Sequence, residues 1–313
     1  MRVFVAGATG AIGRQLVPML LAAGHQVTGL ARSEARRQAV ERLGAQAVVA
    51  DALDRDALVS AVVAARPEAV VHQLTSIPRA LDPRRTAKQF EATGRLRTEG
   101  TRNLIEGAAE AGAGRFAAQS IAFAYAPEGS AVKDEREPLW ADAPAAFAPT
   151  VAAVEELERQ VLEANGAVLR YGHIYGDGTG YAPDGAIAEM VRKRRYPVVG
   201  DGGGVFSFVT TADAARAAKL ALERDVRGVL NVVDDDPAPL REWLPEFARA
   251  LGAPPPRRIP TWLARPLAGK FGVMSLTRLR GADNSRAKLE LGWHPEPASW
   301  REGFAALGRD HHT

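Results

Sequence analysis

Short apolar runs rich in β-branched residues alternate with longer, alanine-rich amphipathic stretches through the first half of the chain. Continuous apolar strands separated by helices are typical of a parallel sheet covered on both faces. Right-handed crossovers between such strands give an α/β, doubly wound fold of the Rossmann type. The apolar runs predict strands at Val3–Ala6, Val27–Ala31, Ala47–Ala50, Ala69–Leu74, Arg115–Gln119 and Ala167–Tyr171. The amphipathic stretches predict helices near 12–24, 33–43, 54–65, 84–112 and 150–165.

The pattern becomes less regular after about residue 175, where glycine-rich loops ("YGDGTGYAPDG", "VGDGGG") and a proline-rich connector ("GAPPPRRIP") appear. A strand at Gly228–Val233 and a helix near 211–224 are expected to return to the main sheet. We therefore predict a nucleotide-binding domain at 1–174 plus about 205–233, and a smaller substrate lobe at 175–204 and 234–313. Further short helices are expected near 184–195, 239–251 and 299–308.

The composition narrows the class of protein. The 313 residues are 46% hydrophobic and 25% charged, as in ordinary globular domains. The formal net charge of +3 gives no reason to expect nucleic acid or a membrane surface as partner. The absence of cysteine excludes disulfides, thiolate metal sites and a cysteine nucleophile. Because the chain starts on a strand and has no apolar run near about 18 residues, we expect a cytoplasmic location.

A glycine triplet, Gly7, Gly10 and Gly13, follows the first predicted strand and opens the first helix. In such a turn the first glycine permits a sharp bend, the second lets the backbone approach a pyrophosphate, and the third lets the helix pack on the sheet. Ala11 and Ile12 lie in the same turn, at the positive end of the helix, where an anion binds. Glycines also serve ordinary turns, but this position favours a dinucleotide.

The end of the second strand bears on the choice of cofactor. An acidic residue usually holds a free ribose 2′-hydroxyl there, whereas this chain has Ala31 and Arg32. Arg32, aided by Arg36 or Arg37, is suited to a 2′-phosphate, so NADP is favoured over NAD. The alternative is that these arginines only solvate the start of a helix.

The next two strand ends extend the predicted cofactor site. Asp51 is suited to the adenine amino group or, alternatively, to capping the following helix. The remaining contacts that we expect along this crevice are Ala52, Leu53, Leu74 and Thr75.

The chain resembles the extended short-chain dehydrogenase/reductase family, which includes NAD(P)-dependent epimerases and dehydratases. The resemblance rests on "GATGAIG", "ADALD", "VVHQL", "GTRNLIEGAAEAG", "LRYGHIYG", "FSFVTTADAARAAKLALE" and "LGWHPEPASWREGF", in the family's order. It implies a Rossmann domain with a C-terminal substrate lobe, an active site between them, and a homodimer formed through two long helices.

The resemblance also implies a serine or threonine and a Tyr-x-x-x-Lys helix, in which the lysine lowers the pKa of the tyrosine. The matching segment "QSIAFAYAP" places Ile121 at the serine position, and Phe147 and Val151 stand at the tyrosine and lysine positions. Because no Tyr-x-x-x-Lys occurs anywhere in the sequence, the family's ordinary mechanism is not available.

Another group must then supply any proton that the reaction needs. Tyr125 follows the fifth strand and His173 the sixth, at the edge where this fold binds ligands. We predict these two as candidate acids, and Ser120 as a group that bonds cofactor or substrate. Tyr171 and His173 are also expected near the cofactor. Each has a structural alternative, such as a hydrogen bond to backbone.

Other polar groups are interpreted as structural. His72 lies within an apolar strand, and "RKRR" at 192–195 is typical of a solvated helix face. Neither Asp234–Asp236 nor the terminal histidines has the arrangement of a metal site, so no metal is predicted.

These observations predict an NADP(H)-dependent oxidoreductase, a reductase that acts on a small, hydrophobic carbonyl, enone or imine with a non-standard proton donor. The apolar residues at 121, 147 and 151 favour a hydrophobic pocket. Two alternatives remain open at this point. One is a non-catalytic NADP(H) sensor, and the other is an epimerase, isomerase or cyclase that retains its cofactor.

Overall fold

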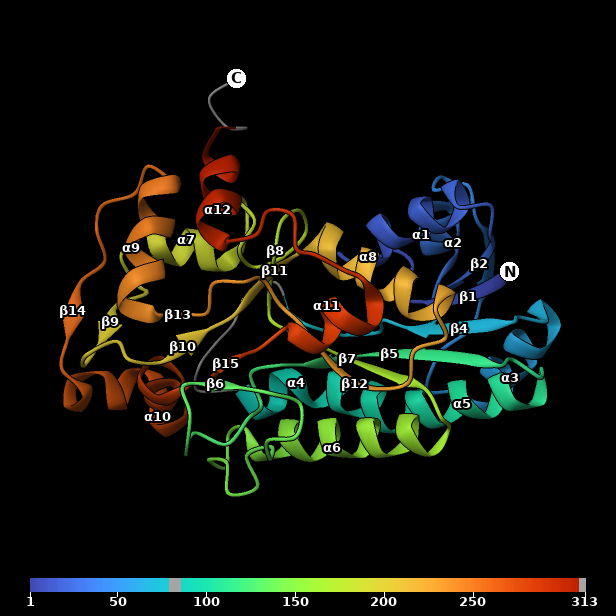
Figure 1. The fold of residues 1–313 in the computed structure, drawn as a ribbon, viewed down its shortest axis with the longest axis horizontal. Helices are drawn as coiled ribbons and strands as arrows, with labels where there is room; N and C mark the ends of the chain where they lie inside the picture. Colours follow the sequence, from blue (N-terminus) through green and yellow to red (C-terminus); the bar gives the residue numbers. More distant parts are fainter. Residues whose placement is uncertain (79–85, 310–313) are drawn as a thin grey trace.

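A seven-stranded parallel sheet forms the centre of the computed structural model, which describes residues 1–78 and 86–309 (Figure 1). The strand order is β12-β7-β5-β4-β1-β2-β3, and every neighbouring pair is parallel. This confirms the predicted doubly wound α/β fold. The strands are β1 (Arg2–Ala6), β2 (Gln26–Ala31), β3 (Gln46–Val49), β4 (Ala69–His72), β5 (Arg115–Ile121), β7 (Ala167–Tyr171) and β12 (Gly228–Val232).

Helices cover both faces of this sheet, as Figure 1 shows. One face packs against α1, α2, α8 and α11 through a core of aliphatic residues, and the other packs against α3, α5 and α6. The predicted return of the helix near 211–224 to the main sheet is confirmed, because α8 contributes to the first core. The helices are α1 (Gly13–Ala22), α2 (Glu34–Glu41), α3 (Arg55–Ala65), α5 (Thr101–Glu110), α6 (Ala148–Glu163), α8 (Thr211–Glu223) and α11 (Ser285–Leu291).

The long helix predicted near 84–112 is interrupted. It consists of α4 (Thr86–Arg95), a π-helical turn at Leu96–Gly100, and then α5. A π turn widens the helix by one residue and is frequent at functional sites. Here it lies beside the end of β4, because the carbonyl of Leu96 is 3.3 Å from Nε2 of His72.

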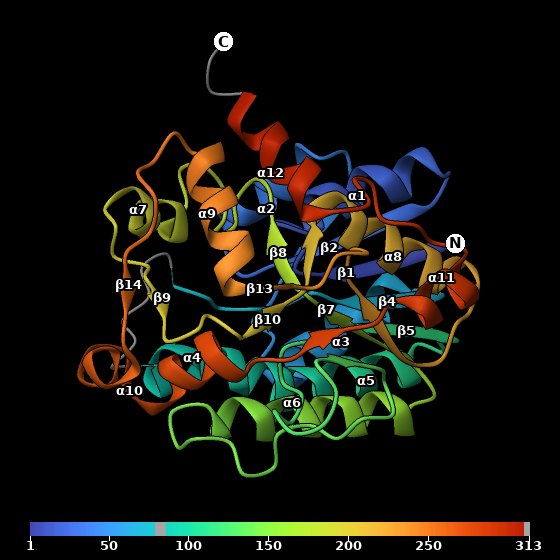
Figure 2. The same cartoon turned by 60° about the vertical axis from the view of Figure 1, so that its left-hand side comes forward.

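The remaining elements gather beyond the carboxyl ends of the central strands (Figure 2). The helices α7 (Ala186–Arg192), α9 (Leu240–Ala250) and α12 (Trp300–Arg309) agree with prediction. The helix α10 (Thr261–Arg278) was not predicted, because Pro266 and a kink at Gly269 (φ 68°) interrupt its apolar periodicity. Short strand pairs complete this part: β6 (Val132–Lys133) with β15 (Gly281–Ala282), β8 (His173–Tyr175) with β11 (Phe208–Thr210), β9 (Val198–Val199) with β14 (Arg258–Ile259), and β10 (Val205–Phe206) with β13 (Ala238–Pro239).

An aromatic core holds this second region together. Trp243, Phe247, Trp300 and Phe304 are essentially fully buried in it, which supplies the apolar contacts that the short strands alone cannot. The predicted boundaries between the two domains stay a prediction. Within the described ranges, no helix is long and apolar enough to cross a membrane.

Candidate active site

The glycine turn has the geometry that its sequence requires. Gly7 adopts φ +101°, and a Cβ there would stand 2.6 Å from the carbonyl oxygen of Gln73. A Cβ on Gly13 would collide with the carbonyl of Gly7. The amides of Ala11 and Ile12 donate no backbone hydrogen bond within the described residues. Because these amides lie at the start of α1, they fit the phosphates of a dinucleotide.

Gln73 supports this turn and was missed by the sequence analysis. Its side chain is buried, and its Nε2 donates to the hydroxyl of Tyr171 over 3.1 Å. Its Oε1 is buried without a partner in the described part of the chain. Tyr171 itself is fully buried and donates to the carbonyl of Ala214 over 3.2 Å. The hydroxyl of Tyr171 thus holds the side chain of Gln73 beneath the turn. The expected contact of Tyr171 with the cofactor stays a prediction.

The three arginines that follow β2 differ in whether other side chains already bind their guanidinium groups. Nε of Arg37 lies 3.0 Å from Oε1 of Glu41, and its Nη1 lies 3.6 Å from Glu34. Arg36 donates to Oγ1 of Thr9 over 3.2 Å, which brings its guanidinium to the glycine turn. The exposed Arg32 has no side-chain bond or ion pair among the described residues. Neither Arg32 nor Arg36 forms an ion pair in the described part of the chain, and their contact with a 2′-phosphate stays a prediction.

The remaining predicted cofactor residues lie along the same sheet edge, because they follow β3 and β4, two parallel strands of the one sheet. Oδ1 of Asp51 accepts from the amide of Leu53 over 3.0 Å. The carbonyl of Ala52 accepts from Asn103 over 3.0 Å. Leu74 is half-buried and Thr75 is exposed directly after β4. Their contacts with a cofactor stay a prediction.

Arg14 is a further cation at the turn that sequence reasoning missed. Its guanidinium lies so close to Gly178 that a Cβ on this residue would collide with it. Gly178 has φ +77° and belongs to the glycine-rich loop after β8. The start of α1 and this loop therefore meet beside the glycine turn.

The three positions that the family resemblance matches to the catalytic groups lie together. Ile121, Phe147 and Val151 are 5%, 4% and 3% exposed and belong to one apolar cluster with Trp140. Phe147 also stacks on Phe271 of α10 at a ring distance of 4.3 Å. These side chains form a packed apolar layer. The hydrophobic substrate pocket expected here stays a prediction.

Ser120 and Tyr125 were expected to face a ligand, and the structure gives them other partners. Oγ of Ser120 is fully buried and donates to Oε1 of Glu158 over 2.6 Å. The hydroxyl of Tyr125 donates to Oδ1 of Asn231 over 2.7 Å and accepts from Nη1 of Arg170 over 2.8 Å. Burial raises the pKa of Tyr125 to about 12. Both residues thus belong to a buried hydrogen-bond network, which makes each a poor proton donor.

Arg170 and Glu158 form the centre of this network. Nε and Nη2 of Arg170 donate to the two carboxylate oxygens of Glu158 over 2.9 and 2.6 Å. Because both side chains are almost fully buried, their charges compensate each other where water cannot. This pair also holds its two neighbours in the network, because Glu158 accepts from Ser120 and Arg170 donates to Tyr125.

His173 lies among aromatic rings. Its imidazole is 4.6 Å from the rings of Phe123 and Phe206, and Nδ1 lies 3.4 Å from the carbonyl of Ser207. Burial lowers its pKa to about 4, so the ring is neutral at neutral pH. With the proton on Nδ1, the unbonded Nε2 is an acceptor, and His173 cannot act as a cationic acid near neutrality.

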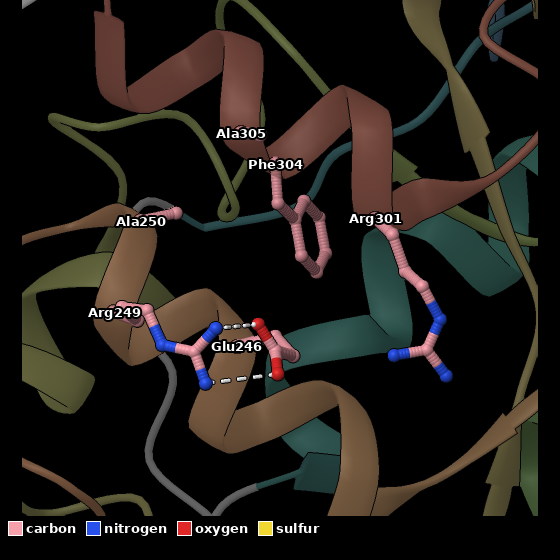
Figure 3. Close-up of a pocket in the computed structure, with 6 residues that line it drawn as sticks. All are labelled: Glu246, Arg249, Ala250, Arg301, Phe304 and Ala305. Carbon is pink, nitrogen blue, oxygen red and sulfur yellow. Dashed lines mark hydrogen bonds and ion pairs between the residues drawn. The ribbon is translucent and has the colours of Figure 1, made fainter.

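A separate surface hollow lies between α9 and α12, and Figure 3 shows its walls. Arg249 donates to both carboxylate oxygens of Glu246 there. None of its residues follows a strand of the main sheet, so we do not assign it to the candidate site. Its lining residues are Glu246, Arg249, Ala250, Arg301, Phe304 and Ala305.

Comparison with known proteins agrees with this geometry. Residues 3–232 match the NAD dependent epimerase/dehydratase family. The chain belongs to this family. A 3-diazoavenalumate denitrifying reductase from a Streptomyces species is 53% identical over 313 residues, which span 99% of this chain and 100% of the relative.

A second relative and a solved structure are also similar to this chain. A 4-hydroxy-2-methyl-3-oxo-4-farnesyl-3,4-dihydroquinoline-1-oxide ketoreductase from Stigmatella aurantiaca is 31% identical over 252 residues, covering 78% of this chain and 71% of the relative. The UDP-glucose 4-epimerase of Thermotoga maritima superposes with a TM-score of 0.77 at 22% identity, over 100% of this chain and 99% of that one. The protein is an NAD(P)-dependent reductase of the extended short-chain dehydrogenase/reductase type.

Proposed function

We propose that this protein is an NADPH-dependent reductase that replaces the diazo group of a small carboxylate substrate by hydrogen and releases N2. The 53% identical relative is a 3-diazoavenalumate denitrifying reductase that aligns over its whole length. The packed apolar layer of Ile121, Phe147 and Val151 is the observation in this chain that carries the proposal. It stands where the wider family keeps its proton-transfer groups.

The chemistry of a diazonium group explains why such a layer is tolerated. Reduction of a carbonyl needs both a hydride and a proton. Replacement of a cationic diazonium group needs only the hydride: its electron pair forms the new C–H bond, and the C–N electron pair leaves with neutral N2. Atoms and charges balance without an acid. A site that has lost its tyrosine and lysine therefore remains competent for this reaction.

The residues of the glycine turn fit the dinucleotide, which supplies a hydride when bound. The free amides of Ala11 and Ile12 would hold its pyrophosphate. Arg32 and Arg36 would bind a 2′-phosphate, which favours NADP over NAD. The neutral His173 and its aromatic neighbours would exclude water from a reactive substrate.

A labelling experiment tests this function. The protein is incubated with NADPH and 3-diazoavenalumate carrying ¹⁵N in the diazo group. We expect loss of the NADPH absorbance in step with labelled N2. With deuterium at C4 of NADPH, the label should enter the product carbon, whereas D2O with ordinary NADPH should leave that carbon unlabelled. Deuterium from D2O at the carbon would contradict a reaction without a proton donor.

Ketone reduction is the second candidate, and the 31% identical ketoreductase favours it. This reaction would need a proton from a group other than Tyr125, whose hydroxyl is engaged. NADPH oxidation with ketones, but none with 3-diazoavenalumate, would support this candidate over the first.

A further inference from the structure

The π-helical turn between α4 and α5 contains a buried cation without a partner. Arg97 is 6% exposed. Its guanidinium makes no hydrogen bond or ion pair within the described residues. The other buried cations are satisfied: Arg170 pairs with Glu158, and Lys133 donates to Glu137 over 3.1 Å. A guanidinium carries five N–H donors. The Arg97 nitrogens are not among the fully enclosed unpaired atoms of the described residues, so they can be reached from outside.

The nearest source of negative charge does not satisfy Arg97. Glu158 acts on it electrostatically, but both oxygens of this carboxylate accept from Arg170, and one also accepts from Ser120. Across Arg97, Arg170 and Glu158, the buried charges sum to one excess positive charge. The other titratable neighbour of Arg97 is His72. Burial lowers the pKa of this imidazole to about 4, so the ring is neutral.

The position of Arg97 points to a ligand as the missing acceptor. The adjacent Leu96 contacts His72, the last residue of β4, and Glu158 contacts Ser120 near the end of β5. Arg97 thus lies between these strand ends, on the sheet edge where ligands bind in this fold. Ser120 directly precedes Ile121 of the packed apolar layer.

We propose that Arg97 is the anion-recognition residue of this reductase, and that its guanidinium binds an anionic oxygen of the substrate. This inference rests on the proposed function, and two oxygens of the substrate qualify: its carboxylate, or an oxyanion conjugated with the diazo group. In the second case, hydrogen bonds from the Arg97 guanidinium keep the negative charge on the conjugated oxygen. The carbon then keeps diazonium character, which makes it a better acceptor of hydride.

The test measures binding and stability, so it does not depend on turnover. Calorimetry of avenalumate, the compound without the diazo group, with the NADP⁺ complex should show at least tenfold weaker binding for Arg97→Met. Arg97→Lys keeps the charge but loses the paired N–H donors of the planar guanidinium, so its affinity for avenalumate should be intermediate. NADP⁺ affinity should change less than twofold. Arg95→Met is the matched control, because Arg95 lies on the same helix, is exposed and pairs with Glu99.

The methyl ester of avenalumate distinguishes the two oxygens. If the carboxylate is the partner, the ester should bind the wild-type protein as weakly as the variant. If the conjugated oxygen is the partner, ester binding should still depend on Arg97. Equal binding of avenalumate to wild type and Arg97→Met would overturn the inference, and so would an equal loss of NADP⁺ affinity.

Thermal unfolding without ligand gives an independent readout. Removal of an uncompensated buried charge should leave the melting temperature of Arg97→Met unchanged or higher. A marked fall would show that the folded protein itself satisfies the guanidinium, which would also overturn the inference. Failure of avenalumate to bind the wild-type protein would instead count against the proposed substrate, while the melting result would still decide the role of Arg97.

Discussion

Nη1 of Arg170 donates to the hydroxyl of Tyr125 over 2.8 Å, deep inside the protein. The same tyrosine donates to Asn231, which lies 106 residues further along the chain. These bonds tie the segment that follows β5 to β7 and β12 near the carboxyl ends of the two strands. It also removes from proton chemistry the tyrosine that best matches a replacement acid by position.

Tyr125→Phe should therefore reduce stability and spare catalysis. Loss of the hydroxyl leaves Asn231 and Arg170 each short of a partner, so the free energy of unfolding should fall by about 1–3 kcal/mol. Denaturant unfolding measures this change. The kcat should stay within about threefold of wild type, because the engaged hydroxyl donates no proton to the substrate. A tenfold loss would correspond to about 1.4 kcal/mol of barrier. A tenfold loss of kcat with normal stability would restore Tyr125 as a catalytic acid.

Arg32→Ala should discriminate between the two nicotinamide dinucleotides. Because Arg32 has no side-chain partner among the described residues, its guanidinium is available for a 2′-phosphate. Its loss should weaken NADPH at least tenfold, about 1.4 kcal/mol, and leave NADH within about twofold. Fluorescence titration measures both dissociation constants. Arg37→Ala is the control, since Arg37 already pairs with Glu34 and Glu41. Equal effects of Arg32→Ala on both dinucleotides would contradict the assignment.

The buried His72 should make stability depend on pH in a defined direction. Burial lowers its pKa from 6.5 to about 4. Between these values the unfolded chain binds a proton that the folded chain does not, so stability falls as pH decreases from 6.5 towards 4. His72 alone contributes up to about 1.4 kcal/mol per pH unit in this window. Unfolding of His72→Gln at pH 7 and pH 5 should show a smaller pH dependence than wild type, and an identical dependence would contradict the prediction.

Val151→Lys should not restore the family's chemistry. Val151 is 3% exposed within an apolar cluster, and an ammonium there would have no partner. We expect a loss of several kcal/mol in unfolding free energy. Leu162→Lys is the matched control, since Leu162 lies on the same helix but is 44% exposed, and it should be nearly neutral. The double variant Phe147→Tyr with Val151→Lys should not raise turnover of 3-diazoavenalumate. A gain would show that a proton relay limits the native reaction.

Local patterns in the sequence determined the main fold and the nucleotide turn. The apolar runs of β1 to β5, β7 and β12 and most of the helices between them follow from periodicity, which depends on neighbours a few residues apart. Gly7 and Gly13 could be assigned because a turn at the end of the first strand permits no side chain there. The sequence also shows that no Tyr-x-x-x-Lys occurs in the chain, and the family resemblance matches Ile121, Phe147 and Val151 to the catalytic positions.

Only the tertiary structure decided what the polar residues of the site do. Whether Tyr125, Ser120 or Tyr171 meets a ligand depends on partners such as Asn231, Glu158 and Ala214, which lie far along the chain. The neutral state of His173 depends on the aromatic rings folded around it, and the unpaired state of Arg97 on which oxygens reach it. Burial and hydrogen bonding set the charge and availability of each group, and no local pattern records them.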